Sequence, residues 1–100
     1  MNSIGAALSP DVERALREIC QVTAMTTDEN LIADFFDCLF TPSERQDMAK
    51  RWLLVREIIS GTTQREISRK LGLSLCKITR GSREVKKPDS AFKKMLALLS

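Results

Sequence analysis

The sequence contains no histidine among its 100 residues. Without an imidazole, a chain cannot use His-assisted nucleophilic catalysis and cannot form the His-Glu-x-x-His site of a zinc protease. The sequence also lacks a glycine-rich phosphate loop, an internal repeat and a low-complexity tract. No pattern pairs two carboxylates in a cleft as general acid and base. An enzyme is therefore the least favoured class, and no metal site is expected.

Cysteine is scarce. Cys20, Cys38 and Cys76 are odd in number and form no Cys-x-x-Cys pair. This usage favours a reducing cytosol over a disulfide framework. The longest apolar runs are far too short to cross a membrane, and the N-terminus lacks the basic-then-apolar pattern of a secretory signal. We therefore expect a cytoplasmic protein with no membrane partner.

What the chain does contain is a marked asymmetry of charge. Residues 1–60 hold six Lys/Arg against ten Asp/Glu, whereas residues 61–100 hold ten against three. The net charge of +3 hides this difference. A basic C-terminal part is expected of a protein that contacts nucleic-acid phosphates, although it would also suit an acidic protein partner.

Apolar residues recur at helical spacing and predict six helices with short connections and no strand. Each helix begins at a serine or threonine that can cap the free N–H groups of the first turn. Three of these residues, Thr26, Thr41 and Thr63, have a glutamate three positions later, which is the spacing of a reciprocal capping box. The third helix is expected to end at Gly61 and the last helix to extend to Leu99. In chain order the predicted caps are Ser9, Thr26, Thr41, Thr63, Ser74 and Ser90.

The apolar content predicts that a second copy of the chain completes the fold. Hydrophobic residues make up 43% of the sequence, and the predicted second helix is apolar over more than half of its circumference. A domain of this size cannot cover all of these faces by itself. We expect an intertwined homodimer, with aggregation as the alternative. Within one domain, 1–100, we predict a loose arm at 1–8, a dimerisation core at 9–60, a helix-turn-helix at 63–86 and a C-terminal core helix at 89–100.

Residues 63–86 have the pattern of a DNA-binding helix-turn-helix. The alternative is an ordinary helical hairpin, but such a hairpin does not need the basic surface that the second helix has here. One position departs from the pattern, because Gly81 stands where a branched apolar residue is usual, and another side chain must fill that space. Six positions agree with the motif: the apolar residues Ile67, Leu71, Leu73 and Ile78, the small residue Ser68, and the turn glycine Gly72.

Two arginines near this motif point to a small-molecule site. Arg51 is on the third predicted helix, and Arg80 is on the second helix of the motif, directly before Gly81. A guanidinium group stacks on flat rings and binds a carboxylate with two hydrogen bonds. A gap lined by glycine between two such groups would suit a small, flat, anionic or zwitterionic ligand. The alternative is that both arginines are solvated or contact phosphates.

Five groups of residues follow one another along the middle of the chain. They are Thr41-Pro42-x-Glu44-Arg45, Arg51, Gly61, Gln64-Arg65-Glu66 and Ile78-Thr79-Arg80-Gly81-Ser82. Together they resemble the bacterial tryptophan repressor family over roughly residues 36–86, with a single-residue gap near Gly61. The resemblance implies an all-α chain of six helices, an intertwined homodimer, and a palindromic double-stranded operator DNA as the partner.

The resemblance also implies a ligand. In this family free L-tryptophan is the corepressor, and it lies between the core and the hairpin, where it holds the second helix of the motif at the spacing that DNA requires. By this resemblance Arg51 and Arg80 would sandwich the indole ring, and Arg80 would also hold the carboxylate. Thr41 would assist with the carboxylate, and Gly81 would border the ring.

The residues expected around the ligand's ammonium group follow the family pattern less closely than those around the ring and the carboxylate. The family implies that the backbone carbonyls of Cys38 and Phe40 from the partner chain bind it. Glu84 departs from the family, which usually has serine or another small residue beside this group. Its carboxylate either pairs with the ammonium group or fills the pocket and changes the ligand. Trp52, which follows Arg51, occurs in a sister group of regulators without an established effector, and we expect its side chain to pack in the core.

DNA contacts are predicted from the same positions. Arg65 is expected at a guanine edge, and Gln64 and Lys86 at the DNA backbone. Cys76 would contact a thymine methyl group, with a redox switch beside Lys77 as the alternative. Lys77 and Arg83 replace smaller residues of the best-known repressors, which predicts a different operator sequence. The reading helix would contribute Leu75, Cys76, Lys77, Thr79, Ser82 and Arg83.

The residues and the charge pattern predict a DNA-binding regulator. The resemblance further implies a transcriptional repressor that uses L-tryptophan as corepressor to regulate genes of tryptophan biosynthesis or uptake. No other cofactor is expected. One alternative is a helix-turn-helix regulator with a different effector or none. Another is a protein-interaction module, because related helix pairs also bind polymerase subunits.

Overall fold

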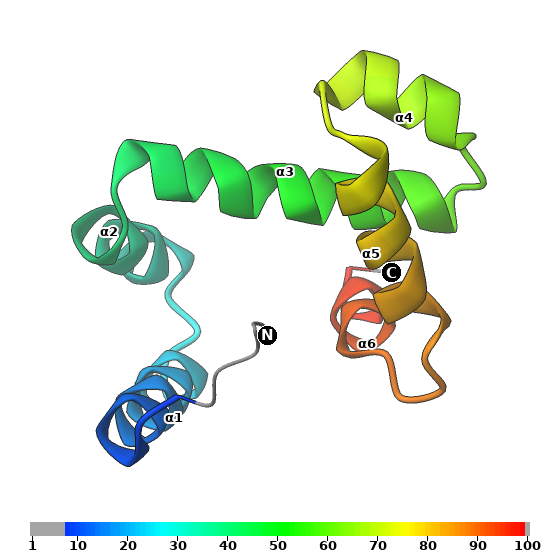
Figure 1. Cartoon of the computed structure of the whole chain (residues 1–100). Coiled ribbons are helices and arrows are strands. Elements are labelled where there is room, and N and C mark those ends of the chain that lie inside the picture. The colour runs from blue at the N-terminus through cyan, green and yellow to red at the C-terminus, as the bar shows by residue number, and fades with distance from the viewer. Residues whose placement is uncertain (1–7, 100) are drawn as a thin grey trace. The chain divides into compact units, whose positions relative to one another are not determined.

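A computed structural model describes residues 8–99 of the chain, and within that range it contains six α-helices and no strand (Figure 1). The predicted all-α class and helix count are confirmed. The chain divides into two compact units, Met1–Leu39 and Phe40–Ser100. The loose arm predicted at 1–8 lies, apart from Leu8, outside the described residues. None of the helices in the described range is long and apolar enough to cross a membrane.

The first unit consists of α1 (Pro10–Ala24) and α2 (Glu29–Leu39). As predicted, Ser9 caps α1, because its hydroxyl oxygen accepts a hydrogen bond of 3.3 Å from the backbone N–H of Val12. Proline at the first helical position costs nothing there, since its missing N–H has no partner within the helix.

The predicted cap of α2 is wrong. Thr26 does not cap this helix with Glu29, because α2 begins only at Glu29. The cap is Asp28, whose Oδ1 accepts hydrogen bonds from the backbone N–H groups of Asn30 at 3.0 Å and Leu31 at 3.2 Å. The Thr26 hydroxyl instead accepts from the N–H of Asp28 at 3.1 Å and shapes the connection before the helix. A carboxylate also interacts more favourably than a hydroxyl with the positive end of the helix dipole.

The helices of the first unit expose their apolar faces. Within the described residues of α1 and α2, no side chain is fully buried. Leu16 retains 46% of its accessible surface and Leu31 retains 55%. The rings of Phe35 and Phe36 are tilted by 43° to each other, with centroids 6.1 Å apart. These faces are regular in spacing, yet the packing of α1 and α2 within this unit leaves them largely exposed.

The second unit is built on α3 (Pro42–Ile59). Its predicted capping box is present in both directions, because Thr41 Oγ1 accepts from the N–H of Glu44 at 3.1 Å and Glu44 Oε1 accepts from the N–H of Thr41 at 2.9 Å. The helix ends at Ile59 with Ser60 as its C-cap, and the predicted stop at Gly61 is the next residue, where a positive φ of 86° reverses the chain. The N–H of Thr62 then bonds to the carbonyl of Glu57 at 3.0 Å, which completes a Schellman motif.

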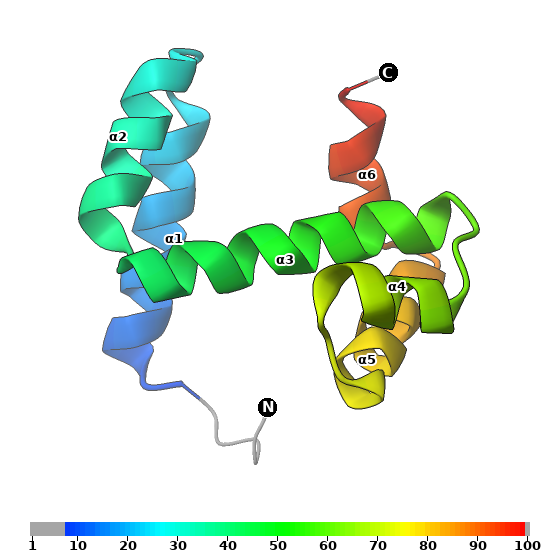
Figure 2. The ribbon, with the colours of Figure 1, turned by 90° about the horizontal axis from the view of Figure 1, so that it is seen from above.

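Three shorter helices complete this unit: α4 (Gln64–Leu71), α5 (Leu75–Lys86) and α6 (Ala91–Ala97). Figure 1 and Figure 2 show α4 and α5 against the C-terminal part of α3, with α6 on the opposite side of α3 from α4. Ser90 caps α6 and is buried, with its hydroxyl accepting from the N–H of Lys93 at 3.3 Å. The last helix ends at Ala97, so Leu99 lies beyond it and the predicted end was two residues too far.

The core of the second unit joins one residue from each of three helices. Leu54 of α3, Ile67 of α4 and Ile78 of α5 are buried together. Each fully buried branched side chain contributes about 1.5–3 kcal/mol through the removal of apolar surface from water. The partly buried Ile58, Leu71 and Leu73 pack around them. This cluster fixes the position of the two-helix segment on α3.

Candidate nucleic-acid interface and ligand site

The helices α4 and α5 and their connection form a hairpin, residues 63–86, whose backbone follows the sequence prediction. Thr63 caps α4 by accepting from the N–H of Glu66 at 3.2 Å. Ser74 caps α5 by accepting from the N–H of Lys77 at 3.3 Å. The Glu66 carboxylate binds Arg69 at 2.7 Å, within α4. The threonine half of the predicted capping box is thus confirmed, and Glu66 forms an ion pair along its own helix.

The turn of the hairpin depends on two small residues. Gly72 has φ of 64° and donates its N–H to the carbonyl of Ser68 at 2.9 Å, which ends α4. A residue with a side chain would be strained at this φ. The Ser68 hydroxyl donates to the carbonyl of Leu73 at 3.0 Å, across the turn. Serine therefore fits the small position of the motif and also satisfies a turn carbonyl.

Gly81 allows α5 to approach α3 closely. A Cβ atom built on Gly81 would lie 2.8 Å from Leu54 Cδ2 and 3.5 Å from Ile58 Cδ1. The space that a branched residue usually fills in this motif is thus occupied by side chains of α3. On its Cβ side, Gly81 borders the apolar core.

The predicted DNA-contacting residues lie mainly at the two helix starts. Gln64 and Arg65 are exposed in the first turn of α4. Leu75, 61% exposed, opens α5 and is followed by the exposed Cys76 and Lys77. The remaining four predicted contacts follow along α5, of which Thr79 and Ser82 are half-buried and Arg83 and Lys86 are exposed.

Several exposed cations of the hairpin form no ion pair. Among residues 8–99, the structure shows no ion pair for Arg65, Lys77 or Arg83. Arg65 and Lys77 lie in the first turns of α4 and α5, where such cations can bind phosphate groups that the positive ends of the helix dipoles also attract. Arg83 lies in the last turn of α5. The arrangement therefore has the charge and the backbone donors that a polyanion requires.

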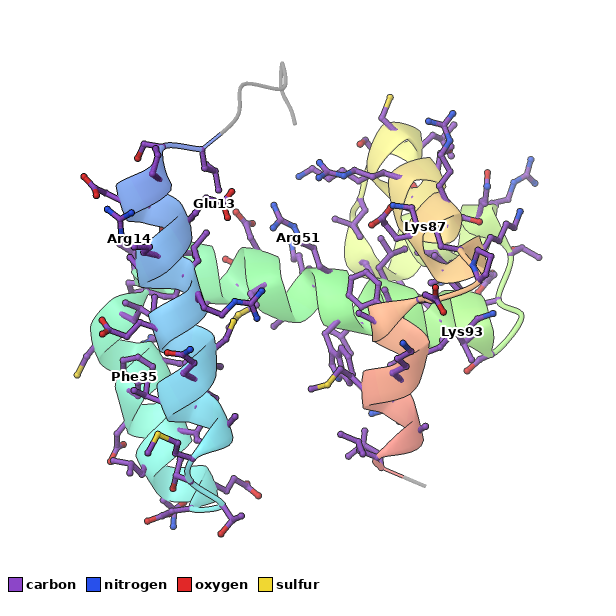
Figure 3. All side chains as sticks on the ribbon, turned by 90° about the horizontal axis from the view of Figure 1, so that it is seen from below. Glu13, Arg14, Phe35, Arg51, Lys87 and Lys93 are labelled. Carbon is purple, nitrogen blue, oxygen red and sulfur yellow. The ribbon has the colours of Figure 1, made fainter. Side chains whose placement is uncertain are left out.

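Two arginines of the predicted ligand site lie on neighbouring helices. Arg51 on α3 and Arg80 on α5 are both exposed. Figure 3 shows Arg51 projecting from the middle of α3 toward the side on which the hairpin lies. Thr41 lies at the start of α3, where its hydroxyl oxygen already accepts a bond from Glu44 N–H, so its hydroxyl proton is the group that it can offer to a carboxylate. Cys38 is exposed near the end of α2, and Phe40 is half-buried before α3.

Glu84 is half-buried and forms an ion pair within the last turn of the hairpin. Its Oε2 lies 2.6 Å from Lys87 Nζ. Together with Trp52, Phe92 and Met95 it lines a shallow hollow of about 440 Å³. Trp52 was expected in the core, yet its side chain is only half-buried and borders this hollow. The Glu84 carboxylate can pair with a ligand's ammonium group only if it binds Lys87 and the ligand together, or if its ion pair with Lys87 breaks.

One cluster near the hairpin was missed by the sequence analysis. Glu57 Oε1 accepts hydrogen bonds from Thr62 Oγ1 at 2.7 Å and from Lys70 Nζ at 3.2 Å. The hydrogen bond from Thr62 and then that from Lys70 hold the pKa of Glu57 below its ordinary value. Glu57 and Lys70 are thirteen positions apart and meet only because the chain reverses at Gly61. No periodic pattern in the sequence connects them.

The second unit carries an exposed, basic two-helix hairpin on a buried apolar cluster. A family model described as Trp repressor protein matches residues 14–100, and the chain belongs to this family. Its members are regulators, so the chain is not an enzyme. The similarity covers nearly all of the described structure.

Curated relatives agree with this assignment. The chain is 42% identical over 69 residues to a Trp operon repressor homolog of Chlamydia trachomatis serovar D, covering 68% of this chain and 73% of the relative. It is 44% identical over 68 residues to the homolog of Chlamydia caviae, covering 67% of each chain. It is 33% identical over 87 residues to the homolog of Vibrio parahaemolyticus, covering 86% of this chain and 84% of the relative. No solved structure matches the chain.

Proposed function

We propose that this transcriptional regulator binds operator DNA through its hairpin and represses transcription. The observation that carries the proposal is the set of unpaired cations at the starts of α4 and α5, next to a turn fixed by Gly72 and Ser68. In this arrangement the start of α5 enters the major groove. Arg65 would read a guanine edge, and Gln64 and Lys86 would position the backbone. The other readers would be Leu75, Cys76, Lys77, Thr79, Ser82 and Arg83.

The repressor is proposed to act as a homodimer. The described part of α1 and α2 exposes regular apolar faces and buries no side chain, which supports a second copy as their cover. Two hairpins related by a two-fold axis would match a palindromic operator. The corresponding half-sites would lie about one helical turn of DNA apart, or a multiple of it.

L-Tryptophan is the proposed corepressor, and genes of tryptophan synthesis or uptake are the proposed targets. Three observations support this proposal: the family, the relatives named Trp operon repressor homologs, and the presence of Arg51 and Arg80 on the two helices that the ligand must link. Gly81 and Thr41 would border the ring and the carboxylate. The partner's Cys38 and Phe40 would bind the ammonium group with Glu84, provided that Glu84 exchanges Lys87 for the ligand.

The test begins with selection of duplexes from a random pool by the purified full chain, with and without tryptophan. Titration of tryptophan in a calorimeter, alone and with the selected duplex, then measures the coupling. The two ligands must tighten each other's binding by the same factor, typically five- to 150-fold for about 1–3 kcal/mol of coupling. Failure to select any sequence would overturn the DNA-binding proposal. Selection without any response to tryptophan would leave the alternative regulator with another effector or none.

A matched ligand pair tests Glu84. Indole-3-propionate lacks the ammonium group but keeps the ring and the carboxylate. If Glu84 binds the ammonium group, tryptophan should bind more tightly than indole-3-propionate, and Glu84→Gln should reduce that difference. Equal binding of both ligands by the unaltered protein would contradict this role.

A further inference from the structure

A single carboxylate holds the chain on both sides of α4. Glu57, in the last turn of α3, accepts hydrogen bonds at the same oxygen from Thr62 at 2.7 Å and from Lys70 at 3.2 Å. Thr62 directly precedes the cap of α4, Thr63, whereas Lys70 lies in the last turn of α4. The carboxylate therefore ties the beginning and the end of α4 to the same point on α3.

The apolar core alone leaves one motion of α4 weakly restrained. Ile67 is the only fully buried residue of α4, with 1% of its surface accessible. Leu71, one turn further along α4, is only partly buried against the same cluster, so a small rotation of α4 about Ile67 costs little buried area. The two bonds to Glu57 act away from Ile67 and oppose this rotation. The Glu57 side chain is 27% exposed, so its bonds are partly shielded from water.

We propose that Glu57 is the positioning residue that fixes the orientation of the hairpin on α3, so that removal of its charge weakens specific DNA binding without any loss of DNA contact. The inference rests on the proposed DNA-binding function. Recognition side chains must be held within about 0.5 Å of their productive positions by surrounding bonds. Arg65 extends from the first turn of α4, so a small rotation about Ile67 displaces it.

The decisive variant is Glu57→Gln, because its two effects change the affinity for the selected duplex in opposite directions. Glutamine keeps an amide oxygen for Thr62 but removes the negative charge that binds Lys70. Loss of a negative charge beside the hairpin raises DNA affinity by long-range electrostatics. Loss of positioning lowers the affinity for the selected duplex by about threefold, which corresponds to the free energy of a partly exposed ion pair. The affinity for a scrambled duplex should be unchanged or higher.

The matched control is Glu66→Gln. It removes the same charge from the hairpin, but Glu66 pairs with Arg69 inside α4 and joins no second helix. This variant should bind selected and scrambled duplexes as well as the unaltered protein or slightly better. The charge-reversed pair Glu57→Lys with Lys70→Glu keeps the net charge and can form the ion pair in the opposite sense. It should recover specific binding relative to Glu57→Lys alone.

Hydrogen exchange provides a readout that does not depend on DNA. The α4 amides should exchange about threefold faster in Glu57→Gln than in the unaltered chain, and faster than in Glu66→Gln, which loses only a more exposed ion pair within α4. If no duplex is bound by the unaltered protein, the proposed function fails and exchange alone decides the positioning role. If Glu57→Gln binds the selected duplex as tightly as the unaltered protein, or its α4 amides are equally protected, the positioning role is overturned while the proposed function stands.

Discussion

The two compact units show the same helical patterning with different outcomes. In the second unit, Ile67 and Ile78 on the apolar faces of α4 and α5 are almost completely buried against Leu54. In the first unit, Leu16 and Leu31 stand at equally regular spacing and keep about half of their surface exposed to water. Periodicity therefore tells which face of a helix will be covered, but it does not tell whether the cover comes from the same chain. The homodimer proposal follows from that difference.

The largest effect should come from a core deletion in the second unit. Ile78→Ala removes a side chain with no accessible surface and should destabilise the protein by about 2–5 kcal/mol, because both burial and packing are lost. Urea unfolding followed by circular dichroism measures this change. The loss should be evident at every protein concentration, since the core lies within one chain.

The counterpart in the first unit is Leu16→Ala. If a second copy covers this face, the substitution should lower the unfolding midpoint and also make it more dependent on protein concentration. Sedimentation of the same samples would show a larger monomer fraction. An unfolding midpoint that Leu16→Ala leaves unchanged at all concentrations would contradict the proposed cover of α1.

The next effect is at the contact between α3 and α5. In an open helix, replacement of glycine by alanine stabilises by about 1 kcal/mol. Gly81→Ala should instead destabilise by about 1–3 kcal/mol, because the new methyl group would meet Leu54 at 2.8 Å. A double-mutant cycle with Leu54→Ala checks the cause, since the alanine at 81 should cost much less once the larger side chain is removed. Additive costs in the cycle would show that Leu54 is not the obstacle.

A smaller effect distinguishes the two candidate caps of α2. Asp28→Ala should destabilise by about 0.5–2 kcal/mol, because the carboxylate accepts from two free N–H groups of the first turn. Thr26→Ala should cost less, since its hydroxyl bonds only within the connection. Thermal unfolding of both variants under the same conditions measures the order. A larger loss for Thr26→Ala would restore the capping box predicted from sequence.

Much of the fold could be predicted because its determinants are local. The caps at Ser9, Thr41 and Ser74 and the reversal at Gly72 each depend on residues within four positions. The same local rule failed at Thr26, where a threonine and an aspartate both offered an oxygen and the aspartate was closer to the helix. Two acceptors two positions apart cannot be separated by spacing alone.

The candidate site was less predictable because its interactions join distant segments. The contact of Glu57 with Lys70 requires the chain reversal at Gly61 and the packing of α4 on α3. The pairing of Glu84 with Lys87 is local, but the sequence could not show whether the carboxylate would prefer this lysine to a ligand. The proposed ammonium-binding carbonyls belong to a partner chain, which a pattern within one sequence does not describe.

The smallest effect concerns pH. Hydrogen bonds from Thr62 and then Lys70 lower the pKa of Glu57 in the folded chain, so the folded state binds a proton less readily than the unfolded state. The stabilising contribution of this carboxylate is therefore complete above its unfolded pKa and is lost as the pH falls through its lower folded pKa. The unfolding midpoint of Glu57→Gln should lie below that of the unaltered chain at about pH 7, and the two should converge toward about pH 3.

Lys70→Gln is the control for the pH experiment, because it removes the partner and keeps the carboxylate. Its difference from the unaltered chain should also shrink as the pH falls, since a protonated Glu57 no longer attracts the ammonium group. Glu66→Gln removes a carboxylate that bonds only within α4, so its profile reports the general effect of one fewer acid on the hairpin. A Glu57→Gln profile parallel to that of the unaltered chain down to about pH 3 would show that the bonds from Thr62 and Lys70 do not favour the charged form of Glu57.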